Sequence, residues 1–152
     1  MAIEAIEQAD LVVIGPGSLY TSILPNLLVR GIADALSRSS APRMYVCNVA
    51  TEMGETQGFC VADHLATLQR HTFASIADFV IANNMPRYLG PGFEGQPVVS
   101  DGKSLIHAEL VLAELIDSDH PVRHDAEKLA HTVLDVGRRA RRNGGALSSA
   151  VK

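Results

Sequence analysis

The sequence contains no tryptophan, only two cysteines and few aromatic residues. Cys47 and Cys60 lie in apolar surroundings and lack Cys-x-x-Cys spacing. This arrangement excludes a disulfide framework and argues against a zinc site. We therefore expect a protein of the reducing cytoplasm that holds no structural metal ion.

Long apolar runs are also absent. No stretch of about 18 apolar residues occurs, and no basic N-terminal segment leads into an apolar one, so neither a membrane-spanning helix nor an export signal is expected. The net charge of −4 and the isoelectric point near 5.8 argue against nucleic acid or an acidic membrane as the main partner. The 152 residues, 47% of them hydrophobic, suffice for the core of one domain.

The chain instead alternates between strand-like and helix-like segments. Apolar runs bounded by turn residues predict buried strands over 11–15, 44–49 and 78–84. Apolar residues at helical spacing predict helices over 23–36 and 61–71 between these strands. This order is typical of an α/β protein, Rossmann-like and three-layered, with helices on both faces of a mostly parallel sheet.

The pattern weakens after Pro86, where glycine and proline predict a loop over 88–95. A short strand is expected over 97–100. Residues 105–116 fit neither the strand period nor the helix period cleanly, and we interpret them as a strand.

The two ends of the chain are expected to differ in order. Residues 1–10 resemble the end of a helix that enters the first strand. Asp125 is a suitable N-cap for a last helix over 126–142. The domain is therefore expected to span residues 1–142, and residues 143–152 are expected to form a flexible tail.

The first predicted strand ends in Gly15-Pro16-Gly17-Ser18, and two further hydroxyls follow at Thr21 and Ser22. In a parallel sheet, ligands bind beyond the carboxyl ends of the strands, where glycines allow close approach and a following helix offers free N–H groups. The turn does not fit G-x-G-x-x-G, because Tyr20 holds the sixth position, and no Gly-Lys-Ser/Thr completes a P-loop. A phosphate-binding turn and a structural corner therefore both remain open.

The second predicted strand is also followed by polar residues: Asn48, Thr51, Glu52, Glu55 and Thr56. Such carboxylates can hold a Mg²⁺ that accompanies phosphates, or accept hydrogen bonds from ribose hydroxyls. The alternative is a polar surface loop that precedes the next helix.

Two more polar groups complete the candidates. The third predicted strand ends in Asn83-Asn84, whose amides suit a base or a sugar but also occur in ordinary turns. Arg123-His124-Asp125 precedes the last helix. An arginine there can bind phosphate through two hydrogen bonds, and the histidine can transfer a proton. A solvated loop explains the triplet equally. No known nucleophile–base motif is present, so whether the chain is an enzyme stays open.

Taken together, these motifs resemble the CofD/YvcK-like family, also known as gluconeogenesis factors or UDP-N-acetylglucosamine-binding proteins. The run from Gly15 to Leu28 resembles the family signature without a gap. The family pattern Asn-Val-Met-Thr-Gln-Pro-Gly-Glu-Thr, followed by Asp-His, is matched at Asn48, Val49, Thr51, Gly54, Glu55, Thr56, Asp63 and His64. Ala50, Glu52 and Met53 depart from it, while Asn83-Asn84 and Arg123-His124-Asp125 are also similar to family features. The resemblance covers most of residues 3–142.

The resemblance implies three alternative functions. The favoured one is a cytoplasmic, YvcK-like regulator that binds a nucleotide sugar such as UDP-N-acetylglucosamine and is linked to cell shape and gluconeogenic growth. The second is a Mg²⁺-dependent transferase, which moves 2-phospho-L-lactate from a guanosine diphosphate-linked donor to a deazaflavin in coenzyme F420 synthesis. The third is a fragment with only a structural or interaction role.

One departure concerns length. Similar family members are about twice as long and begin with a strand and a glycine-rich loop that forms part of the nucleotide site, which has no counterpart before Gly15. The resemblance thus implies the C-terminal half of the domain, with an exposed sheet edge. That edge would pair with a missing N-terminal half or with a second copy of the chain.

The resemblance also implies a role for each candidate residue. The diphosphate is expected at Gly15, Gly17, Ser18, Thr21 and Ser22. Sugar hydroxyls or a Mg²⁺ are expected at Asn48, Thr51, Glu55 and Thr56. The base or ribose is expected near Asn84, and the phosphate charge at Arg123, with His124 beside it and Asp125 orienting it. No catalytic residue is assigned, and no cofactor besides Mg²⁺ is expected.

Overall fold

A computed structural model describes residues 2–149, with side chains described for residues 2–142. Its sheet has four parallel strands in the order β1-β2-β3-β4. Their bounds are Val12–Ile14 (β1), Arg43–Val46 (β2), Phe79–Asn83 (β3) and Glu109–Ala113 (β4). The strand order follows the chain order, and parallel crossovers are right-handed, so all three connections pass over the same face of the sheet.

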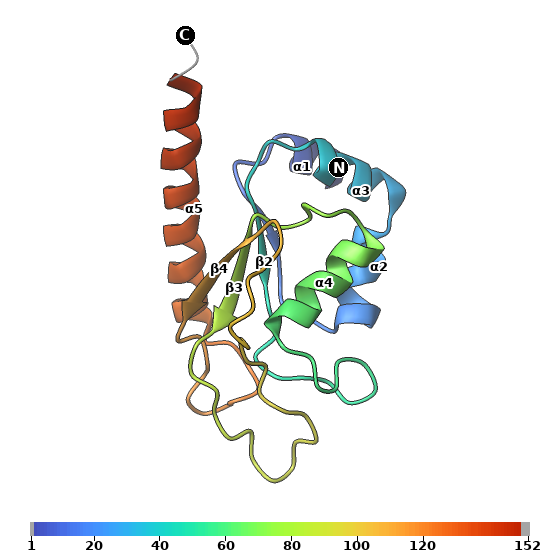
Figure 1. The fold of residues 1–152 in the computed structure, drawn as a ribbon, viewed down its shortest axis with the longest axis vertical. Helices are drawn as coiled ribbons and strands as arrows, with labels where there is room; N and C mark the ends of the chain where they lie inside the picture. Colours follow the sequence, from blue (N-terminus) through green and yellow to red (C-terminus); the bar gives the residue numbers. More distant parts are fainter. Residues whose placement is uncertain (1, 150–152) are drawn as a thin grey trace.

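The crossover face is covered by most of the helices (Figure 1). These are α1 (Ala2–Glu7), the π-helical turn η1 (Leu19–Ile23), α2 (Leu24–Leu27), α3 (Arg30–Arg38) and α4 (Val61–His71). Leu19, Leu65 and Leu68 are fully buried against Tyr45 and Val80 of the sheet. The main core therefore lies between this helical layer and the sheet.

The opposite face is covered by a single long helix, α5 (Ala126–Ser149), which Figure 1 shows alone on its side of the sheet. Val136 packs with Met44, Ile81 and Leu115 in a second, smaller core. Gly137 brings the helix close to the sheet, because a Cβ at this position would lie 3.2 Å from Leu11 Cδ2. The prediction of an α/β protein with helices on both faces of a parallel sheet is therefore confirmed.

The element boundaries differ from the predicted ones in three places. The helix predicted over 23–36 is broken: η1, α2 and α3 replace it, because Val29 adopts an extended conformation with ψ 114°. The strand predicted over 97–100 reduces to one isolated bridge between Ala50 and Pro97. Helix α5 continues to Ser149, past the predicted end at residue 142. Residues 150–152 of the expected tail lie outside the described residues.

A partly buried ion pair joins the amino-terminal ends of β2 and β3. The guanidinium of Arg43 donates to Asp78 through Nε (3.2 Å to Oδ2) and Nη2 (3.2 Å to Oδ1), and through Nη1 to the carbonyl of Leu36 at 3.0 Å. The Asp78 carboxylate also accepts the Arg43 backbone N–H at 2.8 Å. The Arg43 side chain is 11% exposed and lies over the ring of Phe73. Removal of the carboxylate would therefore leave a buried charge without its counterion.

We expect Asp78→Ala to lower the free energy of unfolding by about 1–3 kcal/mol, a value reduced for the partial exposure of Asp78. Urea denaturation measures this change. Glu7→Ala is the matched control, because it removes an exposed ion pair with Arg38, and it should cost less than about 1 kcal/mol. Equal losses in the two variants would contradict the structural role of the Arg43–Asp78 pair.

Candidate functional site

A pocket of about 500 Å³ opens at the carboxyl ends of β1 and β2. Three segments far apart in the sequence meet there: the turn after β1, the loop after β2 and the loop before α5. The lining residues are Pro16, Gly17, Asn48, Val49, Ala50, Glu52, Phe93, Val122, Arg123 and His124. Because the carboxyl ends of parallel strands lie at one edge of the sheet, the predicted polar groups after β1 and β2 come together at this edge.

The Asn48 side chain holds the turn after β1 in place. Its Oδ1 accepts the Gly17 N–H at 3.0 Å, and its Nδ2 donates to the Gly17 carbonyl at 2.9 Å. The amide thus pairs with the Gly17 backbone as a neighbouring strand would, beyond the last regular pair of β1 and β2. These two hydrogen bonds hold Gly17, a lining residue of the pocket, in position.

Two carboxylates take up hydrogen-bond donors of the same turn. The Ser18 hydroxyl donates to Glu52 Oε2 at 2.6 Å. The backbone N–H of Tyr20 donates to Glu55 Oε2 at 3.2 Å, and the Thr21 hydroxyl donates to Glu55 Oε1 at 3.0 Å. Ser18 and Thr21 were predicted to surround a diphosphate, and in this structure the hydroxyl of each already has an anionic partner within the chain.

Other predicted site residues lie outside the pocket. Gly15 and Ser22 line a separate groove beside β1. Thr51 and Thr56 are buried and hold the loop after β2: Thr51 Oγ1 accepts the Gln96 N–H at 2.8 Å, and Thr56 Oγ1 accepts the Glu52 N–H at 2.9 Å. Their hydroxyls therefore serve the loop conformation.

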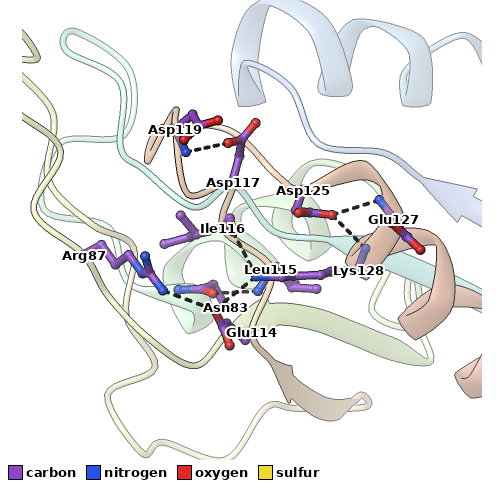
Figure 2. A network of polar contacts seen from close by, with 10 residues as sticks. All are labelled: Asn83, Arg87, Glu114, Leu115, Ile116, Asp117, Asp119, Asp125, Glu127 and Lys128. Atoms are coloured by element: carbon purple, nitrogen blue, oxygen red, sulfur yellow. Dashed lines mark hydrogen bonds and ion pairs between the residues drawn. The ribbon is translucent and has the colours of Figure 1, made fainter.

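The segment that follows β4 is fixed by a network of polar contacts (Figure 2). Asn83 Oδ1 accepts the Leu115 N–H at 3.0 Å, and Glu114 Oε1 binds both Arg87 (3.2 Å) and Lys128 (3.1 Å). Asp125 Oδ1 accepts the N–H groups of Glu127 and Lys128, each at 3.0 Å, and so caps α5 as predicted. Asp125 is therefore occupied with the helix start, whereas it was expected to orient Arg123. Asn84, next to Asn83, is exposed and its side chain makes no polar contact with the described residues.

Arg123 is held by its backbone, while its side chain is free. Its N–H donates to the His120 carbonyl at 2.9 Å, and its own carbonyl accepts the Asp117 N–H at 3.0 Å. Its guanidinium, exposed at the pocket, has no ion-pair or hydrogen-bond partner among the described side chains. It is thus a cation on a well-fixed loop that is available for an anionic ligand.

His124 is a neutral member of the pocket wall. Its Nε2 lies 3.2 Å from the Cys47 carbonyl, and because a carbonyl only accepts, Nε2 carries the proton. Burial lowers the pKa of His124 from its ordinary value, an effect larger than the opposing hydrogen bond to Cys47. The side chain therefore contributes no positive charge at neutral pH.

Phe93 is a lining residue that the sequence pattern did not indicate. It lies in the Gly/Pro-rich loop that was predicted only as a connection. The loop is drawn to the pocket by the hydrogen bonds between Thr51 and Gln96 and by the bridge between Ala50 and Pro97. These contacts join residues far apart in the sequence, so no local sequence signal could have placed the Phe93 ring at the pocket. The ring is suited to stack on a base or a sugar.

The carboxylates do not form a metal site. Among the described residues, no group of three or more His, Cys, Asp or Glu side chains is arranged to hold a metal ion. Glu52 and Glu55 each bind hydroxyl or N–H donors, and they do not converge with a third ligand. In this structure the carboxylates that were expected near a Mg²⁺ are therefore bonded to donors of the turn after β1. In the described part of the chain, no helix has the length and apolar character needed to cross a bilayer.

Comparison with known proteins supports the resemblance inferred from the sequence. The family model described as "2-phospho-L-lactate transferase CofD" matches residues 1–139. A putative gluconeogenesis factor of Thermotoga maritima is 40% identical over 147 residues, and the gluconeogenesis factor of Bacillus subtilis is 37% identical over 142 residues. These matches cover 90% and 88% of this chain, respectively.

The fold is also shared with a solved structure. A crystal structure of a UPF0052 family member from Bacillus halodurans is similar with a TM-score of 0.79 and 36% sequence identity, covering 87% of this chain and 45% of that one. The chain likewise spans 46% of the Thermotoga relative and 45% of the Bacillus subtilis relative. The chain thus spans about half the length of its relatives, and the expectation of a partial family domain is confirmed.

His64 is a second histidine whose burial lowers its pKa, and this shift makes the stability of the fold depend on pH. Its Nδ1 donates to the Cys60 carbonyl at 2.9 Å, and its Nε2 is buried without a partner. Burial lowers the pKa of His64 as it does that of His124, because a protonated ring would carry an unpaired N–H in the core. In the unfolded chain both rings protonate near their ordinary pKa of about 6.5.

We therefore expect the free energy of unfolding to fall as the pH is lowered from about 7.5 through 6.5 towards the folded-state pKa values, since the unfolded state binds more protons in that window. Urea denaturation at several pH values measures the slope. His64→Gln should reduce the slope even though it also lowers stability at neutral pH. A slope that is unchanged in His64→Gln would contradict this explanation.

Proposed function

Because this chain belongs to the CofD/gluconeogenesis factor family, we propose that it binds a nucleotide sugar of the UDP-N-acetylglucosamine type and acts in a YvcK-like regulatory role, linked to cell shape and gluconeogenic growth. The ligand occupies the pocket between Gly17, Asn48 and Arg123. The observation that carries the proposal is the unpaired guanidinium of Arg123, which faces a pocket of about 500 Å³ at the carboxyl edge of a parallel sheet. Pockets of this size and position are typical of small-ligand sites.

The pocket offers a partner for each part of such a ligand. Arg123 binds the diphosphate through charge-assisted hydrogen bonds. Gly17 allows the ligand to approach the backbone closely, because it has no side chain. Phe93 stacks against an aromatic or sugar ring, and the amide and carboxylate of Asn48 and Glu52 meet hydroxyl groups.

A transferase of the 2-phospho-L-lactate type is the second candidate, because the matching family model carries that description. It requires a guanosine diphosphate-linked donor, a deazaflavin acceptor and Mg²⁺. Turnover of these substrates, or tighter binding of GDP than of UDP-linked ligands, would favour the transferase over the regulatory protein.

We also propose that polypeptide outside this chain completes the domain beside β1. The strand is a sheet edge, Val13 is 44% exposed, and a groove of about 480 Å³ runs next to it. Ile23, Leu27 and Ile32 give this groove an apolar wall, and Gly17 lines both the groove and the ligand pocket. The relatives have about as much chain again beyond the matched part, so we assign the groove to that remaining part of the family domain.

Calorimetric titration with UDP-N-acetylglucosamine, with and without Mg²⁺, tests the ligand. We expect binding that does not require Mg²⁺, and we expect Arg123→Ala to weaken it by about 10- to 100-fold, the range for loss of a hydrogen bond to a charged group. Arg70→Ala is the matched control, because Arg70 is also exposed and lies at the far end of α4. No heat at millimolar ligand would refute the binding proposal for this chain.

Co-purification tests the partner. The tagged chain is co-expressed with the part of the Thermotoga maritima relative that the match does not cover, and we expect the two to co-purify. Val13→Glu should abolish recovery, because it places a charge at the sheet edge, whereas Val99→Glu, at a similarly exposed valine away from the groove, should not. Concentration-dependent dimers of the chain alone in light scattering, with no co-purification, would instead assign the edge to a second copy.

A further inference from the structure

Among its lining residues, the ligand pocket contains one carboxylate, Glu52, and one free cation, Arg123. The two side chains do not pair with each other, and Glu52 makes no ion pair with any described side chain. Glu52 is instead held by neutral donors, the Ser18 hydroxyl at 2.6 Å and the Asn48 Nδ2 at 3.4 Å. The pocket lining therefore carries one negative and one positive side chain that do not neutralise each other.

The hydrogen bond from Ser18 decides what Glu52 can bind. A hydroxyl has one proton, and the proton of Ser18 points to Glu52. An anionic group placed here would meet the carboxylate of Glu52, and the Ser18 hydroxyl, whose proton is already bound to Glu52, offers it no donor. Hydroxyl groups of a ligand, by contrast, can donate to the remaining lone pairs of the Glu52 carboxylate.

Glu52 is also fixed in position. Its backbone N–H donates to the buried Thr56 hydroxyl at 2.9 Å, and its carbonyl accepts the N–H groups of Glu55 and Thr56 at 3.2 and 3.0 Å. With the side chain bonded to Ser18 and Asn48, the carboxylate is positioned before any ligand arrives. A preorganised charge discriminates between ligands better than a mobile one, because it cannot move away from a group that it repels.

We propose that Glu52 is a specificity-determining residue that selects nucleoside diphosphate sugars with an uncharged, hydroxyl-rich sugar and rejects those with an acidic sugar. The diphosphate lies at Arg123, and the sugar hydroxyls donate to Glu52. This inference rests on the proposed binding of a nucleotide sugar and adds which sugar class the site accepts. A carboxylate on the sugar would be brought next to Glu52 in a partly buried pocket, where like charges repel strongly.

UDP-glucose and UDP-glucuronic acid test the inference, because they differ only in a hydroxymethyl group against a carboxylate on the sugar. We expect calorimetry of the unmodified chain at neutral pH to show at least about tenfold weaker binding of UDP-glucuronic acid. Glu52→Gln keeps the shape and an acceptor for Ser18 but removes the charge. This variant should bring the ratio of the two dissociation constants close to one, mainly by improved binding of the acidic ligand.

Asp34→Asn is the matched control, because it removes one negative charge from an exposed position on α3 and should leave the ratio unchanged. Equal affinities of the two ligands for the unmodified chain would overturn the inference, and this comparison needs no substitution. The inference would also fall if Glu52→Gln, shown to be folded by circular dichroism, kept the original ratio. If neither ligand binds, the nucleotide-sugar proposal itself fails, and that outcome is distinct from binding without discrimination.

Discussion

The paired hydrogen bonds between the Asn48 amide and the Gly17 backbone hold together the site on which the proposed function depends. They join the turn after β1 to the loop after β2 at the point where regular strand pairing has ended. The turn could otherwise move away from the sheet, because β1 has a neighbour on one side only. With this contact in place, Ser18 reaches Glu52 and Thr21 reaches Glu55. The pocket is therefore a product of side-chain contacts between two loops, built on a short strand.

The hydrogen-bond donors of the turn after β1 are satisfied within the chain. A glycine-containing turn that leads into a helix attracts anions, and here two carboxylates from the loop after β2 satisfy that attraction. Arg123, on a different loop, remains the pocket's available cation. A turn that resembles a phosphate-binding loop thus lines a pocket whose available cation comes from a different loop.

The sequence predicted the architecture well, because its information lies in local periodicity and in parallel-sheet geometry. The apolar runs of β1 to β3 and the spacing in α4 were each recognisable, and helix α4 has the predicted bounds of 61 and 71. Gly17 and Asn48 follow neighbouring parallel strands and line one pocket, as the geometry of the sheet implies, whereas Arg123 was expected there only from the family resemblance. The directions of the side chains were predicted only in part. Asp125 was expected both to cap the last helix and to orient Arg123, and only the cap is formed. Hydroxyl and carboxylate groups satisfy one another through contacts of long sequence separation, such as that between Ser18 and Glu52. Phe93 reaches the pocket through similar long-range contacts, which no local pattern encodes.

The order of the strands also bears on how the chain reaches this structure. Each strand pairs with the next one in the sequence, so no strand must insert between two that are already paired. The sheet can grow from one side as the chain leaves the ribosome, with α4 in place before β3 is added. Helix α5, the last element, then seals the face that the crossovers leave open. Since loop closures in such an order are short, and domains fold as they are synthesised, the core on the crossover side can form early, whereas Met44 and Ile81 on the opposite face stay uncovered until α5 is made.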